Sequence, residues 1–287
     1  MKFRILNESI YDYDSQVSLS IQRLYLRPRE NSRQRLKNYD LKVFPSTTIS
    51  NVLDALGNDL TLVWFSGLAK SVTIYAEAEV ETLDANPFDF VLSDYASKFP
   101  FKYDLALDPG LLPYQYDTHQ QEAGPLLKWL EEHFSKRPSD TIEFITALNT
   151  AVFSQLKYAI REEAGIQTPE QTVKQGGGTC RDYAVLFAAL CRNLGLAARF
   201  VSGYLYAPPE EENKRSVGTM HAWTEVYLPG AGWKGFDPTH GVWCGERFVP
   251  VAHGLRGDAV NPVQGSFYDN NQVGSRMKST VTIDLLA

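Results

Sequence analysis

The chain has 287 residues, of which 44% are hydrophobic and 22% charged, and its net charge is -6. These values are typical of a globular protein with a sizeable core, and the acidic balance argues against nucleic acid as a partner. No apolar run approaches the roughly 20 residues of a membrane-spanning helix, and the first residues lack the features of a signal peptide, so we expect no membrane partner and a cytoplasmic location.

Residues 8–105 favour strands. Within 71–80 the apolar side chains fall at every second position, which is typical of a half-buried strand. Residues 18–26 and 60–65 also predict strands. Turn-forming residues separate these segments at 27–28, 44–46 and 57–59. We therefore expect an antiparallel β-sandwich at the start of the chain.

The segment 106–118 is the best candidate for a linker. It contains Pro109, Gly110 and Pro113 and shows little periodicity. We place the boundary near residue 115, which predicts an N-terminal sandwich over 1–115 and a catalytic core over 116–287.

Helices are predicted at the start of this second region. Residues 122–134 and 141–163 favour helices, and 168–173 favours a shorter one with a proline near its first position. The run 180–194 carries an apolar stripe at helical spacing that Gly195 closes. We expect this last helix to be central and buried.

Strands follow the central helix. Residues 198–206, 222–228 and 233–237 predict strands, and the last two flank a short glycine-containing turn, so they should form a hairpin. Residues 242–276 have no strong period and predict surface loops, before a final strand at 280–285. The predicted class is α+β, with the sandwich followed by helices packed on an antiparallel sheet.

Cys180 stands at the predicted start of the central helix, after three glycines at 176–178. Unpaired backbone N–H groups and the positive end of the helix dipole favour a thiolate there. Cys191 lies on the apolar stripe and Cys244 in a loop, so both are predicted to be structural. With three cysteines and no Cys-x-x-Cys pair, the sequence suggests neither a disulfide framework nor a zinc site.

The predicted hairpin decides whether His221 and Asp237 can meet. If Leu228 pairs with Gly232, the two residues become diagonal neighbours on one face of the sheet. A shift of two residues would place them directly opposite each other, whereas a slip of one would send them to opposite faces. The pattern permits the pair without requiring it.

Together these residues predict an activated thiol. Cys180 would attack an amide or acyl carbon, His221 would take and return the proton, and Asp237 would orient the imidazole. The amide N–H of Cys180 is the natural first donor to an oxyanion, and Gln175 is a candidate for the second. The chemistry calls for no cofactor.

The sequence offers other ionisable residues besides this set. His240 competes with His221 as the base but lies in a predicted turn, so we favour His221. Asp182 is expected to serve the start of the helix or a structural ion pair. No metal site is predicted, because the remaining histidines have no acidic or cysteine neighbour at ligand spacing, namely His119, His133 and His253.

Cysteine-, histidine- and aspartate-containing blocks occur together and in order, at 178–184, 198–204 and 221–239. In these blocks the chain resembles the bacterial transglutaminase-like superfamily. Residues 24–29 and 57–58 are similar to that family's β-rich N-terminal region. The resemblance therefore extends over nearly the whole chain.

The resemblance implies a papain-like core in which Cys180 is the nucleophile, His221 the base and Asp237 its partner. The chain departs from the family pattern at Arg181, where relatives commonly carry glutamine, and at His240, where asparagine is common. Both departures change charge near the expected pocket and therefore bear on substrate preference.

Three functions follow as hypotheses. The first is a thiol-dependent hydrolase of peptide or isopeptide amides, with a protein or peptide as substrate. The second is a transglutaminase, in which an amine resolves the same thioester. The third is a binding module without catalysis. The sequence leaves the oligomeric state open.

Overall fold

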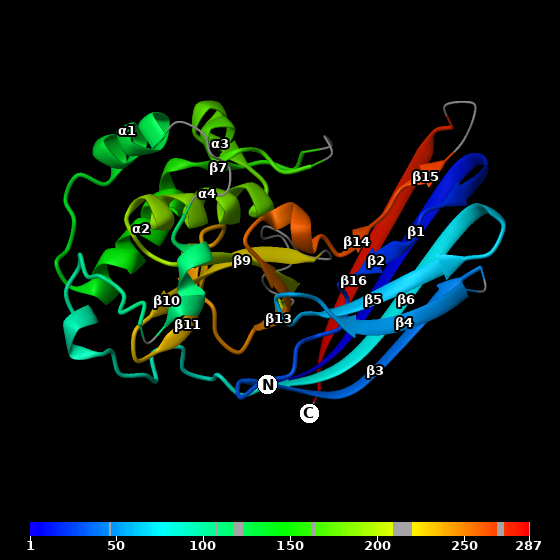
Figure 1. Cartoon of the computed structure of the whole chain (residues 1–287), viewed down its shortest axis with the longest axis horizontal. Helices are drawn as coiled ribbons and strands as arrows, with labels where there is room; N and C mark the ends of the chain where they lie inside the picture. Colours follow the sequence, from blue (N-terminus) through cyan, green and yellow to red (C-terminus); the bar gives the residue numbers. More distant parts are fainter. Residues whose placement is uncertain are drawn as a thin grey trace.

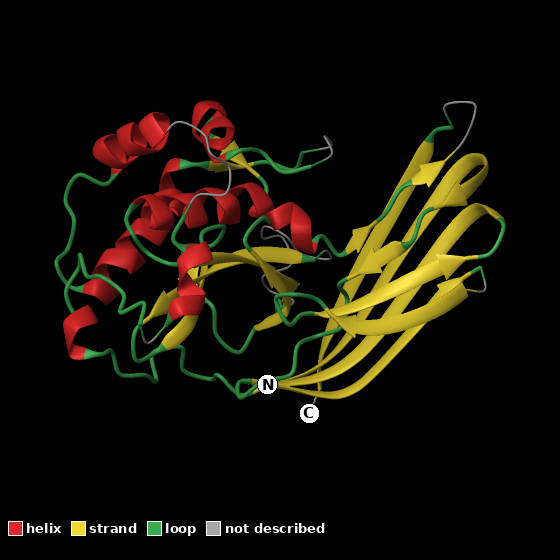
Figure 2. Ribbon diagram, viewed as in Figure 1, coloured by secondary structure: helices red, strands yellow, loops and turns green. Residues whose placement is uncertain are grey.

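Strands fill one half of the molecule, and helices packed on a second group of strands fill the other (Figure 1, Figure 2). This arrangement confirms the predicted α+β class with antiparallel sheets. The computed structural model describes residues 1–45, 47–106, 108–116, 123–161, 165–208, 220–268 and 273–286.

The strand half is an antiparallel sandwich of two sheets. Leu24 and Val63 of one sheet share a buried cluster with Val17, Val72 and Ile74 of the other. The strands are β1 (Lys2–Leu19), β2 (Gln22–Leu24), β3 (Gln34–Phe44), β4 (Thr47–Leu53), β5 (Asp59–Phe65), β6 (Leu68–Thr82), β14 (Val263–Gln264), β15 (Phe267–Tyr268) and β16 (Ser275–Leu286). One sheet has the order β15-β1-β6-β3 with β16 also on β1, and the other has the order β14-β2-β5-β4.

The strand predicted over residues 71–80 lies within β6. Its apolar side chains at every second residue are buried, and the residues between them are more exposed. The predicted strand over 18–26 is divided, because the chain leaves β1 after Leu19 and enters β2 at Gln22. The alternation in the sequence therefore predicts where strands lie, but it does not predict the residues at which they begin and end.

The end of the chain returns to the sandwich. Strand β16 pairs with β1 from Lys2↔Leu286 to Tyr13↔Ser275, and Figure 1 shows the two strands side by side. The prediction assigns residues 116–287 to the second region, but the last strand of this range completes the N-terminal sheet. A physical reason is the edge of β1, whose backbone groups would otherwise lack partners along that side. The boundary near residue 115 stays a prediction.

The second half contains an antiparallel sheet with the order β12-β11-β10-β9-β13. Its predicted hairpin forms in the expected register, with Leu228 opposite Gly232. The prediction of loops throughout 242–276 is wrong, because a strand at Phe248–Gly254 pairs with the first strand of this sheet. The strands are β9 (Ala198–Leu205), β10 (His221–Leu228), β11 (Gly232–Asp237), β12 (Val242–Trp243) and β13 (Phe248–Gly254).

Four α-helices accompany this sheet in the described ranges, and α4 packs on β10 and β9. They are α1 (Ala123–His133), α2 (Thr141–Gln155), α3 (Pro169–Gln175) and α4 (Cys180–Asn193). Helix α4 ends where predicted, beside Gly195 with its φ of 84°. None of the helices described is long and apolar enough to cross a membrane.

Some predicted helix and linker ends differ from the structure or fall outside it. Helix α2 ends at Gln155 rather than at residue 163, and β7 (Lys157–Tyr158) follows it and pairs with β8 (Gly177–Gly178). Parts of these predictions lie outside the described residues, namely 117–120, which include His119, 122 and 162–164. Within the predicted linker, Pro109–Tyr114 form a 3-10 helix.

The two halves share a buried cluster next to α4. Phe3 and Val80 of the sandwich belong to the same cluster as Cys180, Ala184 and Tyr204. The Tyr204 hydroxyl also donates a 3.1 Å hydrogen bond to the carbonyl of a residue between β2 and β3, Leu26. The sandwich is therefore packed directly against the region that holds the cysteine.

Asn58, in the turn before β5, links the halves by hydrogen bonds. Its side chain is fully buried, and its Nδ2 donates to the carbonyl of His253 at 2.8 Å while its Oδ1 accepts from the N–H of the same residue at 2.9 Å. Nδ2 also donates to Asp54 at 2.9 Å. The amide thereby satisfies both backbone groups of one residue in β13.

We expect Asn58→Ala to lower the free energy of unfolding by about 2 kcal/mol, because it leaves buried backbone groups of His253 without partners. Asn38→Ala, at an exposed position of β3, is the matched control and should change stability by less than about 0.5 kcal/mol. Urea denaturation of both variants measures the difference. Equal stability of the two variants would contradict this role.

Candidate active site

Cys180 is the first residue of α4, as the sequence predicts. Thr179 takes an extended conformation as the N-cap, and the side chain of Cys180 is nearly buried, with 8% exposure. The start of a helix carries unpaired N–H groups and the positive end of its dipole. Both features stabilise a thiolate more than a thiol.

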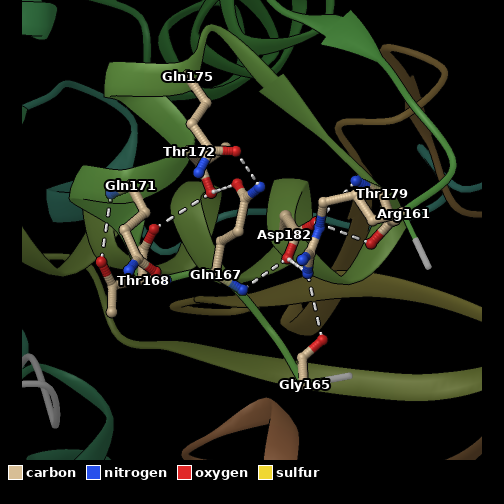
Figure 3. A network of polar contacts seen from close by, with 9 residues as sticks. All are labelled: Arg161, Gly165, Gln167, Thr168, Gln171, Thr172, Gln175, Thr179 and Asp182. Carbon is tan, nitrogen blue, oxygen red and sulfur yellow. Dashed lines mark hydrogen bonds and ion pairs between the residues drawn. The ribbon is translucent and has the colours of Figure 1, made fainter. Parts of the chain in front are cut away.

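Asp182 fixes the start of this helix (Figure 3). Its buried carboxylate accepts hydrogen bonds from the N–H and hydroxyl of Thr179, at 2.8 and 2.9 Å, and from the N–H of Gln167 at 2.8 Å. Arg161 forms a two-pronged ion pair with it through Nε at 2.9 Å and a terminal nitrogen at 3.1 Å. The expected role of Asp182 at the helix start and in an ion pair is confirmed.

The glycines before Cys180 allow this close packing. Gly176 ends α3 with a φ of 67°, a conformation that side chains disfavour. A Cβ on Gly178 would lie 2.7 Å from the carboxylate oxygen of Asp182. A larger residue there would push the chain away from the anchored carboxylate and move the start of α4.

The hairpin brings His221 and Asp237 together. His221 begins β10 and Asp237 ends β11, and in the observed register the two are diagonal neighbours. His221 Nε2–H donates to Asp237 Oδ2 at 2.8 Å, and both side chains are fully buried. The predicted contact therefore exists, and water has no access to it.

Asp237 holds a second imidazole as well. His240 Nδ1–H donates to the same Oδ2 at 2.6 Å, while Oδ1 accepts the backbone N–H of Thr239 at 2.8 Å. The competitor predicted in the turn is thus a partner of the carboxylate. Its position three residues after Asp237 was the available sequence signal. The three ligand-type atoms of His221, Asp237 and His240 lie within 4.8 Å of one another, and the hydrogen bonds to one oxygen account for that grouping.

These contacts shift the ionisation of the pair. Burial by itself would lower the pKa of His221, but the charge and hydrogen bond of Asp237, together with Cys180, raise it to about 10. Burial would raise the pKa of Asp237, but the charges and hydrogen bonds of His221 and His240 bring it well below its usual range. The pair is therefore an imidazolium held by a carboxylate.

The other ring nitrogen of His221 is left for the thiol. Nδ1 has no partner at ordinary hydrogen-bond geometry among the described residues, and the interaction of the ring with Cys180 contributes to its raised pKa. Hydrogen bonds between catalytic groups are often long before substrate binds. The structure thus brings Cys180, His221 and Asp237 together in this order.

The remaining predicted residues lie apart from this set. Cys191 is fully buried in the core of the second half, where burial raises the pKa of its thiol. Burial also raises the pKa of Cys244, which lies just after β12. His133 ends α1, and His253 lies in β13.

Gln175, the candidate second oxyanion donor, lies at the end of α3. Its Oε1 accepts a 2.6 Å hydrogen bond from Gln167. It lines a cavity of about 560 Å³ together with the glycines that lead into Cys180 and with Lys157 and Arg161. Cys180 itself is not part of that lining, so the donor role of Gln175 stays a prediction.

We expect Asp182→Asn to lower the free energy of unfolding by about 3 kcal/mol near neutral pH, because Arg161 loses its ionic partner. Burial would raise the pKa of Asp182, but hydrogen bonds from Arg161, Thr179 and Gln167 lower it. A lowered pKa stabilises the fold above the unfolded value of about 3.9, and this stabilisation is lost as the pH falls.

The stability difference between wild type and Asp182→Asn should therefore shrink as the pH falls from about 7 to about 3. Chemical denaturation across this range measures it. Asp258→Asn, which affects an exposed pair with Arg256, is the control and should cost less than about 1 kcal/mol. A difference independent of pH would contradict the ionised state of Asp182.

Two family models match parts of this chain. Residues 128–238 match the family model of the transglutaminase-like superfamily, and residues 3–81 match that of the bacterial transglutaminase-like N-terminal region. An uncharacterized protein of Mycobacterium tuberculosis (strain ATCC 25618 / H37Rv) is 26% identical, with 94% of this chain and 89% of that protein covered. An uncharacterized protein of Mycobacterium leprae is 24% identical, with 93% of each covered.

A solved structure shares the whole fold. It is described as a "Putative Cysteine Protease" from Cytophaga hutchinsonii, and it superposes with a TM-score of 0.76 over 100% of this chain and 92% of its own. At 20% identity, this likeness shows the fold alone. Residues 128–238 are therefore a core of the transglutaminase-like superfamily, and residues 3–81 ahead of it are a bacterial transglutaminase-like N-terminal region.

Proposed function

We propose that the protein is a cysteine-dependent amide-bond enzyme that forms a thioester on Cys180. The observation that carries this proposal is the buried hydrogen bond between His221 and Asp237, with the ring beside a thiol at a helix start. A binding module would gain little from burying a charged imidazole and carboxylate next to a cysteine, because burying charges is costly.

In the first half of the reaction, the Cys180 sulfur attacks the amide carbon, and the carbonyl oxygen becomes an oxyanion. The backbone N–H at the start of α4 faces this charge, and one such donor contributes about 3 kcal/mol in comparable enzymes. When the C–N bond breaks, His221 gives its proton to the leaving amine. The acyl group stays on sulfur as a thioester.

In the second half, water or an amine attacks the thioester. His221 takes a proton from the incoming nucleophile, and the sulfur leaves as a thiolate. Asp237 holds the ring in place through both halves and stabilises its charged form. Water gives a free acid, whereas an amine gives a new amide.

We favour water as the acceptor and a peptide or isopeptide amide as the substrate. The solved structure that shares the fold is described as a "Putative Cysteine Protease", and our choice follows that description. Transfer to an amine, as the family name implies, is the alternative, because it uses the same three residues. We place the enzyme in the cytoplasm, where a reducing environment keeps the Cys180 thiol usable.

Incubation of the protein with a glutamine-containing protein and a fluorescent primary amine tests this proposal. We expect free acid product by mass spectrometry without stable incorporation of the amine. Incorporation would overturn hydrolysis in favour of transfer. Absence of both products, with peptide and isopeptide substrates also unchanged, would contradict the enzyme assignment.

The two histidines on Asp237 provide a matched pair of variants. His221→Ala should lower the rate by about a thousandfold or more, as should Cys180→Ser. His240→Ala should cost much less, because His221 keeps its own bond to the carboxylate. Equal losses from the two histidine variants would argue against His221 as the base.

A further inference from the structure

A second cavity, of about 290 Å³, lies between the sandwich and the core sheet. The loop before β3 contributes Arg29, and the sheet contributes Trp223 and Glu225 of β10. Thr224, between these two, turns toward α4 and donates to the carbonyl of Ala184. Since side chains alternate along a strand, the cavity lies on the face of the sheet away from α4.

Most charges in this cavity are paired. Arg199 forms an ion pair with Glu225 at 2.6 Å. Arg33 donates to backbone carbonyls of the hairpin and lies 3.7 Å from Asp84. The two acidic residues that line the cavity, Glu225 and Asp84, therefore both lie beside these arginines.

Arg29 is the exception. Its guanidinium has no hydrogen bond or ion pair to any residue in the described part of the chain, although it is half-buried and lines the cavity. Burial lowers the pKa of Arg29, the negative charge of Glu225 opposes this effect, and the positive charge of Arg199 adds to it. Burial, followed by the charges of Arg199 and Arg29, also lowers the pKa of His253 to about 3. The cavity therefore has a surplus positive charge and favours an anion.

Gln34 has a buried acceptor atom that a ligand of this cavity could satisfy. Its side chain is 1% exposed, and its Nε2 donates to the carbonyls of Arg29 and Pro250 at 2.6 and 3.2 Å, which fixes the orientation of the amide. Its Oε1 has no hydrogen-bond partner among the described residues. A buried acceptor of this kind is costly unless a donor reaches it.

We propose that this cavity binds a small carboxylate with an N–H group on the adjacent carbon, either an N-acyl amino acid or the C-terminal residue of a peptide. The carboxylate pairs with the guanidinium of Arg29, and the N–H donates to Gln34 Oε1. Trp223 and Trp233 provide apolar walls, and the ring of Trp233 is already stacked under Arg199 at 4.1 Å. The volume suits a ligand at the small end of the usual range for pockets.

This site is separate from the proposed chemistry. Cys180, His221 and Asp237 are not among the residues that line the cavity. Binding can therefore be measured without turnover, so failure of the catalytic proposal would leave this one untouched. The ring of Trp223 nevertheless lies 6.2 Å from that of His221, which places the ligand one side chain away from the pair.

Ligand-observed NMR titration with N-acetylglycine tests the proposal. We expect saturable binding that weakens about tenfold or more with N-acetylglycinamide, which keeps the N–H but lacks the charge. Acetate and inorganic phosphate, which lack the adjacent N–H, should bind more weakly than N-acetylglycine. N-acetyltriglycine distinguishes the two sources, because binding as tight as that of N-acetylglycine indicates a peptide C-terminus.

Variants assign the binding to the cavity. Arg29→Gln should weaken N-acetylglycine binding about tenfold or more, whereas Arg27→Gln, at a nearby arginine outside the cavity whose side chain is 41% exposed, should leave it unchanged. No saturable binding, equal binding of the amide, or binding unaffected by Arg29→Gln would each overturn the proposal. The comparison of ligands on the wild type holds even if Arg29→Gln lowers stability.

Discussion

The buried carboxylate of Asp237 is the constraint on which the rest of the site depends. It accepts hydrogen bonds from two imidazoles and one backbone N–H, and all of these partners lie within or next to the hairpin strands. A charge without water requires such partners. In exchange, the carboxylate fixes the orientation of His221 and keeps it protonated, with its second nitrogen turned toward the cysteine.

A second buried carboxylate, that of Asp182, fixes the position of Cys180. Asp182 ties the start of α4 to Arg161 and Gln167, so the position of Cys180 depends on the loop before the helix. The sandwich packs against the same region through the cluster that includes Cys180. The thiol and the imidazole are thus held by two different carboxylates, Asp182 for the start of α4 and Asp237 for His221.

Local patterns were sufficient for much of this arrangement. The apolar stripe and glycine defined α4, and the short turn set the register that makes His221 and Asp237 neighbours. Strand β13 escaped detection because it is buried on both faces, so its sequence shows no alternation. The pairing of β16 with β1 is a contact between chain ends, which no local period encodes. The bond of His240 to Asp237 depends on a turn geometry that spacing alone left open.

The central claim is that the resting site contains an imidazolium between a carboxylate and a sulfur. The most direct test is a pH titration of the His221 ring followed by nitrogen-15 NMR. The account predicts a ring that stays protonated through neutral pH and loses its proton near a pKa of about 10. A His221 ring that titrates near the ordinary value of about 6.5 would contradict it.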